Sequence, residues 1–350
     1  MKTAARSIFR APAYPVQIDL DLSNRCNLFC RFCHFRYFKP GSTEDFTYDK
    51  FQALAPLLPH LKKVTLFSKF EPLVCRDFLK IYRAIAAYPD IELYFSTNGV
   101  LLNKEVINAL VGRLKYITVS ITGFTRENYR KNMGKDALPI VLKNLRMLKA
   151  AKKRAGTDLP VLRISTVGAL DTVHELTSAV NIAHRMDARE GVQVTSLIGY
   201  DGHLARLMPM KNPALFSAHA RKARAHAKKL GVKFVLQSGD FNANKKATGA
   251  LGHAACTIPW QRMSIQPNGD VYPCPVSYEP VGNIFRQPAL AIWRGKKMRA
   301  FRAGVNNPRR MNYSCSVCIH CRHKSISNRA MNDLSSAKTY IAGMRRRKDR

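Results

Sequence analysis

The chain contains, at residues 23–33, the stretch SNRCNLFCRFC, in which Cys26, Cys30 and Cys33 follow one another with the spacing C-x3-C-x2-C. Three thiolates on one short loop can hold three irons of a [4Fe–4S] cluster and leave the fourth iron open to a ligand from outside the protein. A bacterial ferredoxin has C-x2-C-x2-C, and structural zinc sites usually have paired C-x2-C motifs. Neither pattern fits this stretch, so the spacing points to an iron–sulfur cluster with an open iron.

The segments around this stretch predict a parallel sheet. Apolar and polar residues alternate over residues 16–22, which predicts a strand that ends just before the cysteines. Further strands are predicted at residues 63–67, 91–95, 116–120, 161–167, 192–198 and 233–236. Apolar residues at three- and four-residue spacing predict helices over residues 48–58, 77–87, 104–112 and 138–155. Alternating strands and helices indicate βα units, and about six fit before residue 240, fewer than the eight of a closed barrel.

The cysteine stretch resembles the signature loop of the radical S-adenosylmethionine (SAM) superfamily, whose open iron chelates the amino and carboxyl groups of the methionine part of SAM. Phe32 matches the aromatic residue that this family usually has before the third cysteine, beside the adenine. The resemblance implies an α/β fold, a partial, open (β/α)6 TIM-type barrel over residues 16–240, preceded by a lead-in at residues 1–15.

Residues 68–73, SKFEPL, are similar to the family's Gly-Gly-Glu-Pro segment, which binds the SAM amino group through its backbone and its carboxylate. Glu71 and Pro72 match this segment, whereas Lys69 and Phe70 replace the glycines. The resemblance implies that Glu71 binds SAM.

Two later strand ends carry the other residues that the resemblance assigns to SAM. Residues 96–99, STNG, are similar to the family's Thr-Asn-Gly turn, and Ser120 stands where the family often has a residue that reaches the SAM ribose. The implied SAM-binding set is therefore Phe32, Glu71, Asn98 and Ser120, and no residue is assigned to the substrate reaction itself.

A second group of cysteines lies near the C-terminus. Asn268-Gly269, flanked by alternating apolar residues, predicts a β-hairpin that carries Cys256 and Cys274 toward one place. Residues 250–324 resemble the C-terminal extension called SPASM, or its shorter form, the twitch domain. Because this region has five cysteines rather than seven, the resemblance implies one auxiliary [4Fe–4S] cluster, held by Cys256, Cys274, Cys315 and Cys318, with Cys321 as an alternative ligand. A structural zinc bound by four cysteines is the competing interpretation.

The composition adds a strong positive charge. Lys and Arg number 58 against 23 Asp and Glu, a net charge of +35, which favours an acidic partner such as an acidic peptide or a phosphorylated metabolite. The sequence has no basic motif with interleaved aromatic residues, which disfavours nucleic acid as a partner. Residues 325–350 are predicted to be a basic tail. The absence of an apolar run of membrane length predicts no membrane span, and clustered cysteines without a signal peptide predict a cytoplasmic protein.

The resemblance implies an enzyme in which an electron donor such as flavodoxin or ferredoxin reduces the cluster, and the reduced cluster cleaves SAM. The resulting 5′-deoxyadenosyl radical abstracts a hydrogen from the substrate. We expect a ribosomally synthesised peptide as substrate, modified by oxidation, crosslinking or epimerisation. The alternative is a dehydrogenase or epimerase of a sugar, an aminocyclitol or a nucleotide in natural-product biosynthesis. A third hypothesis is a non-enzymatic Fe–S or zinc protein that binds nucleic acid; the match at Glu71 and Asn98 disfavours it, because such a protein needs no SAM pocket.

Overall fold

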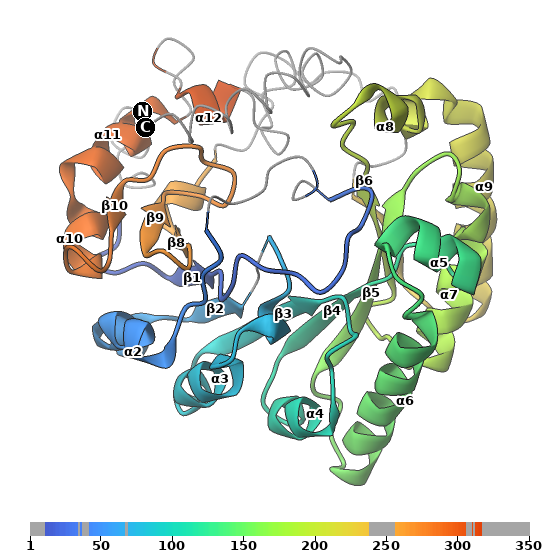
Figure 1. Ribbon diagram of the computed structural model, residues 1–350, viewed down its shortest axis with the longest axis horizontal. Coiled ribbons are helices and arrows are strands. Elements are labelled where there is room, and N and C mark those ends of the chain that lie inside the picture. Colours follow the sequence, from blue (N-terminus) through green and yellow to red (C-terminus); the bar gives the residue numbers. More distant parts are fainter. Residues whose placement is uncertain are drawn as a thin grey trace, which may run out of the picture. The chain divides into compact units, whose positions relative to one another are not determined.

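The computed structural model describes residues 11–33, 36, 42–66, 69–237, 256–305, 310 and 312–316, which form two α/β units (Figure 1). The first unit draws on residues 1–25, 40–93 and 247–350, and the second on residues 26–39 and 94–246. Cys318, Cys321 and the predicted basic tail lie outside the described residues.

The first unit is built around strand β1, which is buried along its whole length. Its strands are β1 (Gln17–Leu20), β2 (Lys63–Leu66), β8 (Arg262–Ile265), β9 (Asp270–Tyr272) and β10 (Gly282–Asn283), in the order β10-β9-β8-β1-β2. β1 runs parallel to β2 on one side and parallel to β8 on the other. The first strand of the C-terminal cysteine region is therefore a direct neighbour of the strand that precedes the cysteine loop, which the sequence did not predict.

The predicted hairpin is confirmed. β8 and β9 are antiparallel, with Ser264 opposite Tyr272. At the turn, Gly269 has a φ of +84°, and a Cβ there would lie 2.5 Å from the ring of Phe285. Glycine is thus required both by the backbone conformation and by the close aromatic neighbour.

The helices of the first unit are short. They are α2 (Tyr48–Phe51), α3 (Phe78–Ala86), α10 (Ala289–Arg294), α11 (Lys296–Gly304) and α12 (Tyr313–Ser316). The predicted helix over residues 48–58 is α-helical only as far as Phe51 and continues as a 3-10 helix, Gln52–His60. Pro56 and Pro59 explain the difference, because proline has no N–H and clashes with the preceding turn of an α-helix.

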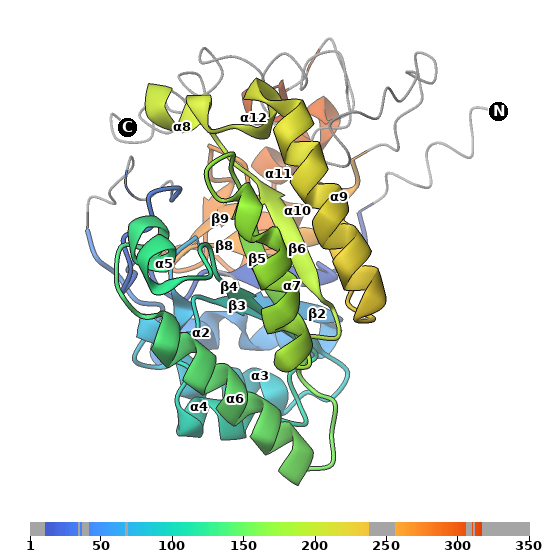
Figure 2. The same cartoon turned by 90° about the vertical axis from the view of Figure 1, so that its right-hand side faces the viewer.

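The second unit is a parallel sheet with helices between its strands (Figure 2). Its strands, in spatial order, are β3 (Glu92–Thr97), β4 (Tyr116–Ser120), β5 (Val161–Gly168), β6 (Val192–Ser196) and β7 (Phe234–Leu236). Its helices are α4 (Lys104–Leu110), α5 (Arg126–Met133), α6 (Leu138–Arg154), α7 (Leu176–Arg185), α8 (Gly202–Arg206) and α9 (Pro213–Lys229). α7 packs against α9 and against β5 and β6. All seven strands predicted before residue 240 are confirmed to within two residues at each end.

The two faces of this sheet differ in polarity. In β4, Ile117 and Val119 are fully buried, whereas Thr118 and Ser120 on the opposite face are half-buried. The register places Ser96 opposite Thr118 and Ser120 opposite Ser165, so polar side chains continue across this face. One face therefore forms the core with the helices, and the other offers hydrogen-bonding groups. In the described part of the chain, none of the helices is long and apolar enough to cross a membrane.

Candidate metal centre and cofactor site

The cysteine loop, residues 26–33, rests on the C-terminal end of α5 in the second unit. The Arg31 N–H donates to the carbonyl of Asn132 at 3.0 Å. The helix ends at Gly134, which has a φ of +80°, and a Cβ there would lie 2.6 Å from the carbonyl oxygen of Phe29. Gly134 therefore both ends α5 and permits the close approach of the cysteine loop.

The three thiols of this loop are half-buried. Cys26 Sγ accepts a hydrogen bond from the Leu28 N–H at 3.5 Å, and Cys30 Sγ lies 3.8 Å from the carbonyl oxygen and from the sulfur of Met133. The Cys33 N–H donates to the carbonyl of Cys30 at 3.1 Å. Within the described ranges, no group of three or more side chains of His, Cys, Asp or Glu has the arrangement needed to hold a single metal ion. The donor set still fits a cubane cluster, because soft thiolates are the usual ligands of iron–sulfur clusters and one short loop supplies three.

Asn98 is the predicted SAM-binding residue that the structure places beside this loop. It follows β3, is 7% exposed, and its Nδ2 donates to Asn27 Oδ1 at 2.7 Å and lies 3.9 Å from Cys26 Sγ. The turn is fixed by Gly99, whose φ is +79° and whose N–H donates to Thr97 Oγ1 at 3.0 Å. This turn thus holds an amide next to the first cysteine.

Phe32 and Ser120 belong to the same unit as the three thiols. Ser120 is the last residue of β4 and is half-buried. Phe32 is half-buried under the guanidinium of Arg31, whose central carbon lies 4.4 Å from the ring centre. Arg31 is held in turn by two hydrogen bonds to Asp171, at 2.7 and 2.8 Å. Their roles in SAM binding stay predictions.

Glu71 lies in the first unit, whereas the three thiols lie in the second. It is 2% exposed and precedes the 3-10 turn Pro72–Val74. Its Oε1 accepts a hydrogen bond from the Leu73 N–H at 3.2 Å, and its own N–H donates to the carbonyl of Arg25 at 3.1 Å. The carboxylate is therefore buried and oriented by its own turn, and its role toward SAM stays a prediction.

Asp21 is a candidate that sequence reasoning missed. It follows β1 and is half-buried near Asp19 and Lys69. Burial raises the pKa of Asp21 to about 7, and Asp19 adds to the rise, while the ammonium and the backbone N–H of Lys69 oppose it. The Lys69 ammonium also lies 6.0 Å from the ring centre of Tyr272. A carboxyl with this pKa can exchange a proton near neutral pH. Sequence carried no signal for it, because the shift depends on burial and on neighbours from other elements.

The raised pKa of Asp21 predicts a pH-dependent stability. The folded protein keeps a proton that the unfolded chain releases above about pH 4, so stability should fall as the pH rises from about 4 to about 7. Asp21→Asn should remove this fall and raise Tm at pH 8 relative to wild type, by about 2–4 °C for each kcal/mol recovered. The measurement is the Tm of the reconstituted wild type and variant in thermal unfolding at pH 6 and pH 8.

Asp136→Asn is the control, because the hydrogen bonds from Arg126 hold the pKa of Asp136 below its ordinary value and outside this window. Equal pH dependence in wild type and Asp21→Asn would contradict the assigned pKa.

The described cysteines of the C-terminal region differ in their surroundings. Cys274 is buried in a hydrophobic cluster with Trp260 and Phe301, and the half-buried Cys315 packs against the same cluster. Cys256 is exposed. The structure thus brings two of the predicted auxiliary ligands to one cluster of side chains; Cys318 and Cys321 lie outside the described residues.

The helix that supports the cysteine loop, α5, was also missed. Its signals are present in the sequence: Thr125 caps the helix by accepting from the Asn128 N–H, Glu127 stands in the first turn, and Gly134 follows the last residue. A cap residue, an early acid and a terminal glycine are the usual signs of helix ends. Apolar periodicity alone does not predict this helix, because Tyr129 and Met133 are the only buried apolar residues of Arg126–Met133.

Comparison with protein families gives two matches. Residues 20–175 match the model of the radical SAM superfamily, and residues 256–322 match the model of an iron–sulfur cluster-binding domain, SPASM. The first match contains Cys26, Cys30 and Cys33, and the second contains the five C-terminal cysteines.

Three related proteins illustrate the range of similarity. An uncharacterised protein of Methanocaldococcus jannaschii is 31% identical over 132 residues, and a probable GTP 3′,8-cyclase of Methanocella arvoryzae is 30% identical over 114 residues. These alignments cover 37% and 32% of this chain and 42% and 36% of the relatives, so the chain matches only about two fifths of their length. The PqqA peptide cyclase of Bradyrhizobium diazoefficiens is 23% identical over 334 residues, covering 92% of this chain and 82% of the relative.

Two solved structures share the fold. SuiB of Streptococcus suis, solved with its precursor peptide SuiA, has a TM-score of 0.63 at 15% identity and covers 84% of this chain and 68% of its own. The enzyme anSMEcpe with bound AdoMet has a TM-score of 0.64 at 15% identity and covers 95% of this chain and 96% of its own. The predicted fold class, a partial TIM-type barrel followed by a small cysteine-rich extension, is confirmed.

Proposed function

We propose that the chain, which matches the radical SAM superfamily over residues 20–175 and the SPASM domain over residues 256–322, is a radical SAM enzyme that modifies a ribosomally synthesised peptide. The observation that carries the proposal is the alignment with a peptide cyclase over 92% of this chain, which spans both domains. The folds of SuiB, solved with a precursor peptide, and of anSMEcpe, solved with AdoMet and a peptide, add support.

SAM and [4Fe–4S] clusters are the cofactors of such an enzyme. When bound and reduced, the first cluster supplies the electron that splits SAM into methionine and a 5′-deoxyadenosyl radical. In this chain Cys26, Cys30 and Cys33 would hold that cluster, and α5 would fix their loop through the Asn132 carbonyl. Asn98 would place its amide beside SAM, next to the first cysteine.

Glu71 would take the SAM amino group. The residue is 2% exposed, and a charge-assisted hydrogen bond made away from water is stronger than the same bond at a surface. Ser120 and Phe32 would contact the ribose and the adenine. These assignments are consistent with the half-buried positions of both residues.

The substrate peptide would lie on the polar face of the second unit's sheet. Ser96, Thr118 and Ser165 are half-buried there, and hydroxyl groups can both donate to and accept from a peptide backbone. The net charge of +35 supports an acidic peptide, because charge complementarity speeds encounter and suppresses wrong partners.

The C-terminal extension would hold an auxiliary cluster on Cys256, Cys274, Cys315 and either Cys318 or Cys321. Such a cluster can accept an electron from the substrate, which supports net oxidation or crosslinking; epimerisation is the further possibility. A flavodoxin or ferredoxin would supply the reducing electron, and a cytoplasmic location would keep the thiols reduced.

A nucleotide is the second candidate substrate, supported by the relatives that are GTP 3′,8-cyclases. The first of them aligns with 32% of this chain, against 92% for the peptide cyclase. A sugar or an aminocyclitol has no comparable support.

The test is a substrate assay on the anaerobically reconstituted, dithionite-reduced protein with SAM. Peptides encoded by short reading frames beside the gene should increase 5′-deoxyadenosine formation several-fold, because a bound substrate traps the radical. The peptide should lose two hydrogens on oxidation or crosslinking, or gain one deuterium in D2O on epimerisation, as read by mass spectrometry. GTP is the parallel substrate. Turnover of GTP with no change in any peptide would overturn the proposal.

A further inference from the structure

Arg25, which precedes Cys26 by one peptide bond, also holds the turn that follows Glu71. Its carbonyl accepts the Glu71 N–H at 3.1 Å, and its Nη2 donates to the carbonyl of Val74 at 3.2 Å. One residue therefore binds both ends of the turn Pro72–Val74. The Glu71 backbone is therefore hydrogen-bonded to the residue that precedes the first cluster cysteine in the sequence.

Asp45 fixes the Arg25 side chain with two parallel hydrogen bonds. Arg25 Nε donates to Oδ1 at 3.2 Å, and Nη2 forms a short contact with Oδ2. The Asp45 carboxylate is 15% exposed and also accepts from Ser23 Oγ at 2.7 Å. Burial opposes ionisation, but the hydrogen bonds from Arg25 and Ser23 outweigh it and hold the pKa of Asp45 below its ordinary value. The pair is therefore charged at neutral pH and geometrically specific.

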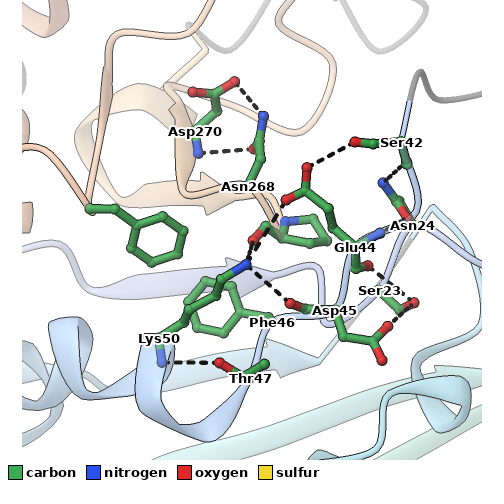
Figure 3. Close-up of polar contacts among 12 residues, drawn as sticks. Ser23, Asn24, Ser42, Glu44, Asp45, Phe46, Thr47, Lys50, Asn268 and Asp270 are labelled. Atoms are coloured by element: carbon green, nitrogen blue, oxygen red, sulfur yellow. Dashed lines mark hydrogen bonds and ion pairs between the residues drawn. The ribbon is translucent and has the colours of Figure 1, made fainter.

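The segment that carries Asp45, residues 42–47, is itself fixed on both sides (Figure 3). On one side the Glu44 N–H donates to Asn24 Oδ1 at 2.7 Å. On the other side Lys50 Nζ donates to the carbonyl of Asp45 at 3.4 Å and to that of Pro267, in the hairpin turn of the extension, at 3.5 Å. Arg25 is thus braced by a segment that also contacts the C-terminal extension.

We propose that Arg25, braced by Asp45, is a positioning residue that holds the turn after Glu71, and with it the Glu71 carboxylate, in the orientation that binds SAM. The inference rests on the proposed function and on the proposed role of Glu71. A carboxylate that is already oriented before its ligand arrives loses less conformational freedom on binding, so the ligand binds more tightly. Arg25 hydrogen-bonds to both ends of the turn that orients this carboxylate.

The test measures SAM dissociation constants for anaerobically reconstituted, unreduced protein, together with its iron and sulfide content. Arg25→Gln and Asp45→Asn should each weaken SAM binding about tenfold, the loss of roughly one charge-assisted hydrogen bond. The double variant should be no weaker than either single variant, because the two side chains act as one unit. The SAM affinity of Arg25→Lys should lie between those of Arg25→Gln and wild type, since lysine keeps the positive charge but cannot donate the two parallel hydrogen bonds of a guanidinium. Iron content should be unchanged, and KM for SAM should rise while kcat at saturating SAM stays constant.

Arg126→Gln and Asp136→Asn are the matched controls. This pair makes the same two-point contact, but its side chains are 71% and 33% exposed. An exposed salt bridge contributes little to stability. SAM affinity in these variants should stay within about twofold of wild type.

Glu71→Ala separates this inference from the assignment on which it rests. It should weaken SAM binding by about ten- to a hundredfold, as expected for a charge-assisted bond of roughly 1.5–3 kcal/mol. Normal affinity in Glu71→Ala would remove Glu71 from the SAM site. Weak binding in Glu71→Ala with wild-type binding in Arg25→Gln and Asp45→Asn would overturn the role of Arg25 alone. Loss of iron from Arg25→Gln would also overturn it, because Arg25 would then act on the cluster loop rather than on the Glu71 turn.

Discussion

Replacing Cys26, Cys30 and Cys33 together by Ala is expected to abolish formation of 5′-deoxyadenosine from SAM. No thiolate of the loop would remain to hold the first cluster, and the electron transfer that splits SAM depends on that cluster. The measurement is the amount of 5′-deoxyadenosine formed by the dithionite-reduced protein, with and without substrate. The effect is expected to be complete, because a cluster with an open iron is needed to deliver this electron to SAM and these three thiolates would hold it.

Cys75→Ala is the control for this result. Cys75 is 4% exposed, and burial raises its pKa to about 11, so it stays a neutral thiol at the pH of the assay. Its replacement should leave 5′-deoxyadenosine formation and iron content in place. Product formation that persists in the triple variant would show that the loop does not hold the cluster.

The triple variant should keep about four irons and four sulfides per chain, against about eight of each in the wild type, as two cubane clusters require. The remaining metal would belong to the extension, where Cys274 and Cys315 pack against one hydrophobic cluster. Metal bound there is expected to stabilise the extension, because metal affinity adds to folding free energy when the ligands come from separate segments. Iron and sulfide analysis of the purified variants measures this.

Single replacements by Ala at Cys315, Cys318 and Cys321 should then divide into two kinds. Two of them should lose the auxiliary cluster, and the third should keep it. An analysis that returns one zinc and four irons in the wild type would contradict the auxiliary cluster. It would make the extension a structural cap and remove it from electron transfer.

The strands of this protein could be predicted from sequence because each is a short segment with a clear pattern between turns. β4, for example, was placed at its exact residues, since apolar and polar positions alternate from Tyr116 to Ser120. The parallel pairing of β1 with β8 could not be predicted in the same way. The two strands are separated by more than 200 residues of chain, and local pattern carries no information about such a partner.

Only part of the candidate site could be predicted from the sequence, for a similar reason. Asn98 is predicted from the sequence to bind SAM, a role that stays a prediction, and its amide lies 3.9 Å from Cys26 Sγ. The supporting contacts were not expected, because they join residues whose local sequence has no special pattern, such as Arg25 with Asp45. The pKa of Asp21 falls in the same class, since it arises from burial beside Lys69 after the fold has formed.

The position of β8 beside β1 has a consequence for how this protein can be shortened or recombined. β1 hydrogen-bonds to β8 along its whole length, from Gln17 opposite Arg262 to Leu20 opposite Ile265. A truncation before β8 would turn β1 into an open sheet edge with unpaired backbone groups and buried side chains newly exposed, a template for aggregation. The C-terminal region is therefore not a detachable module, and a chimera that exchanges it must carry a strand able to pair with β1.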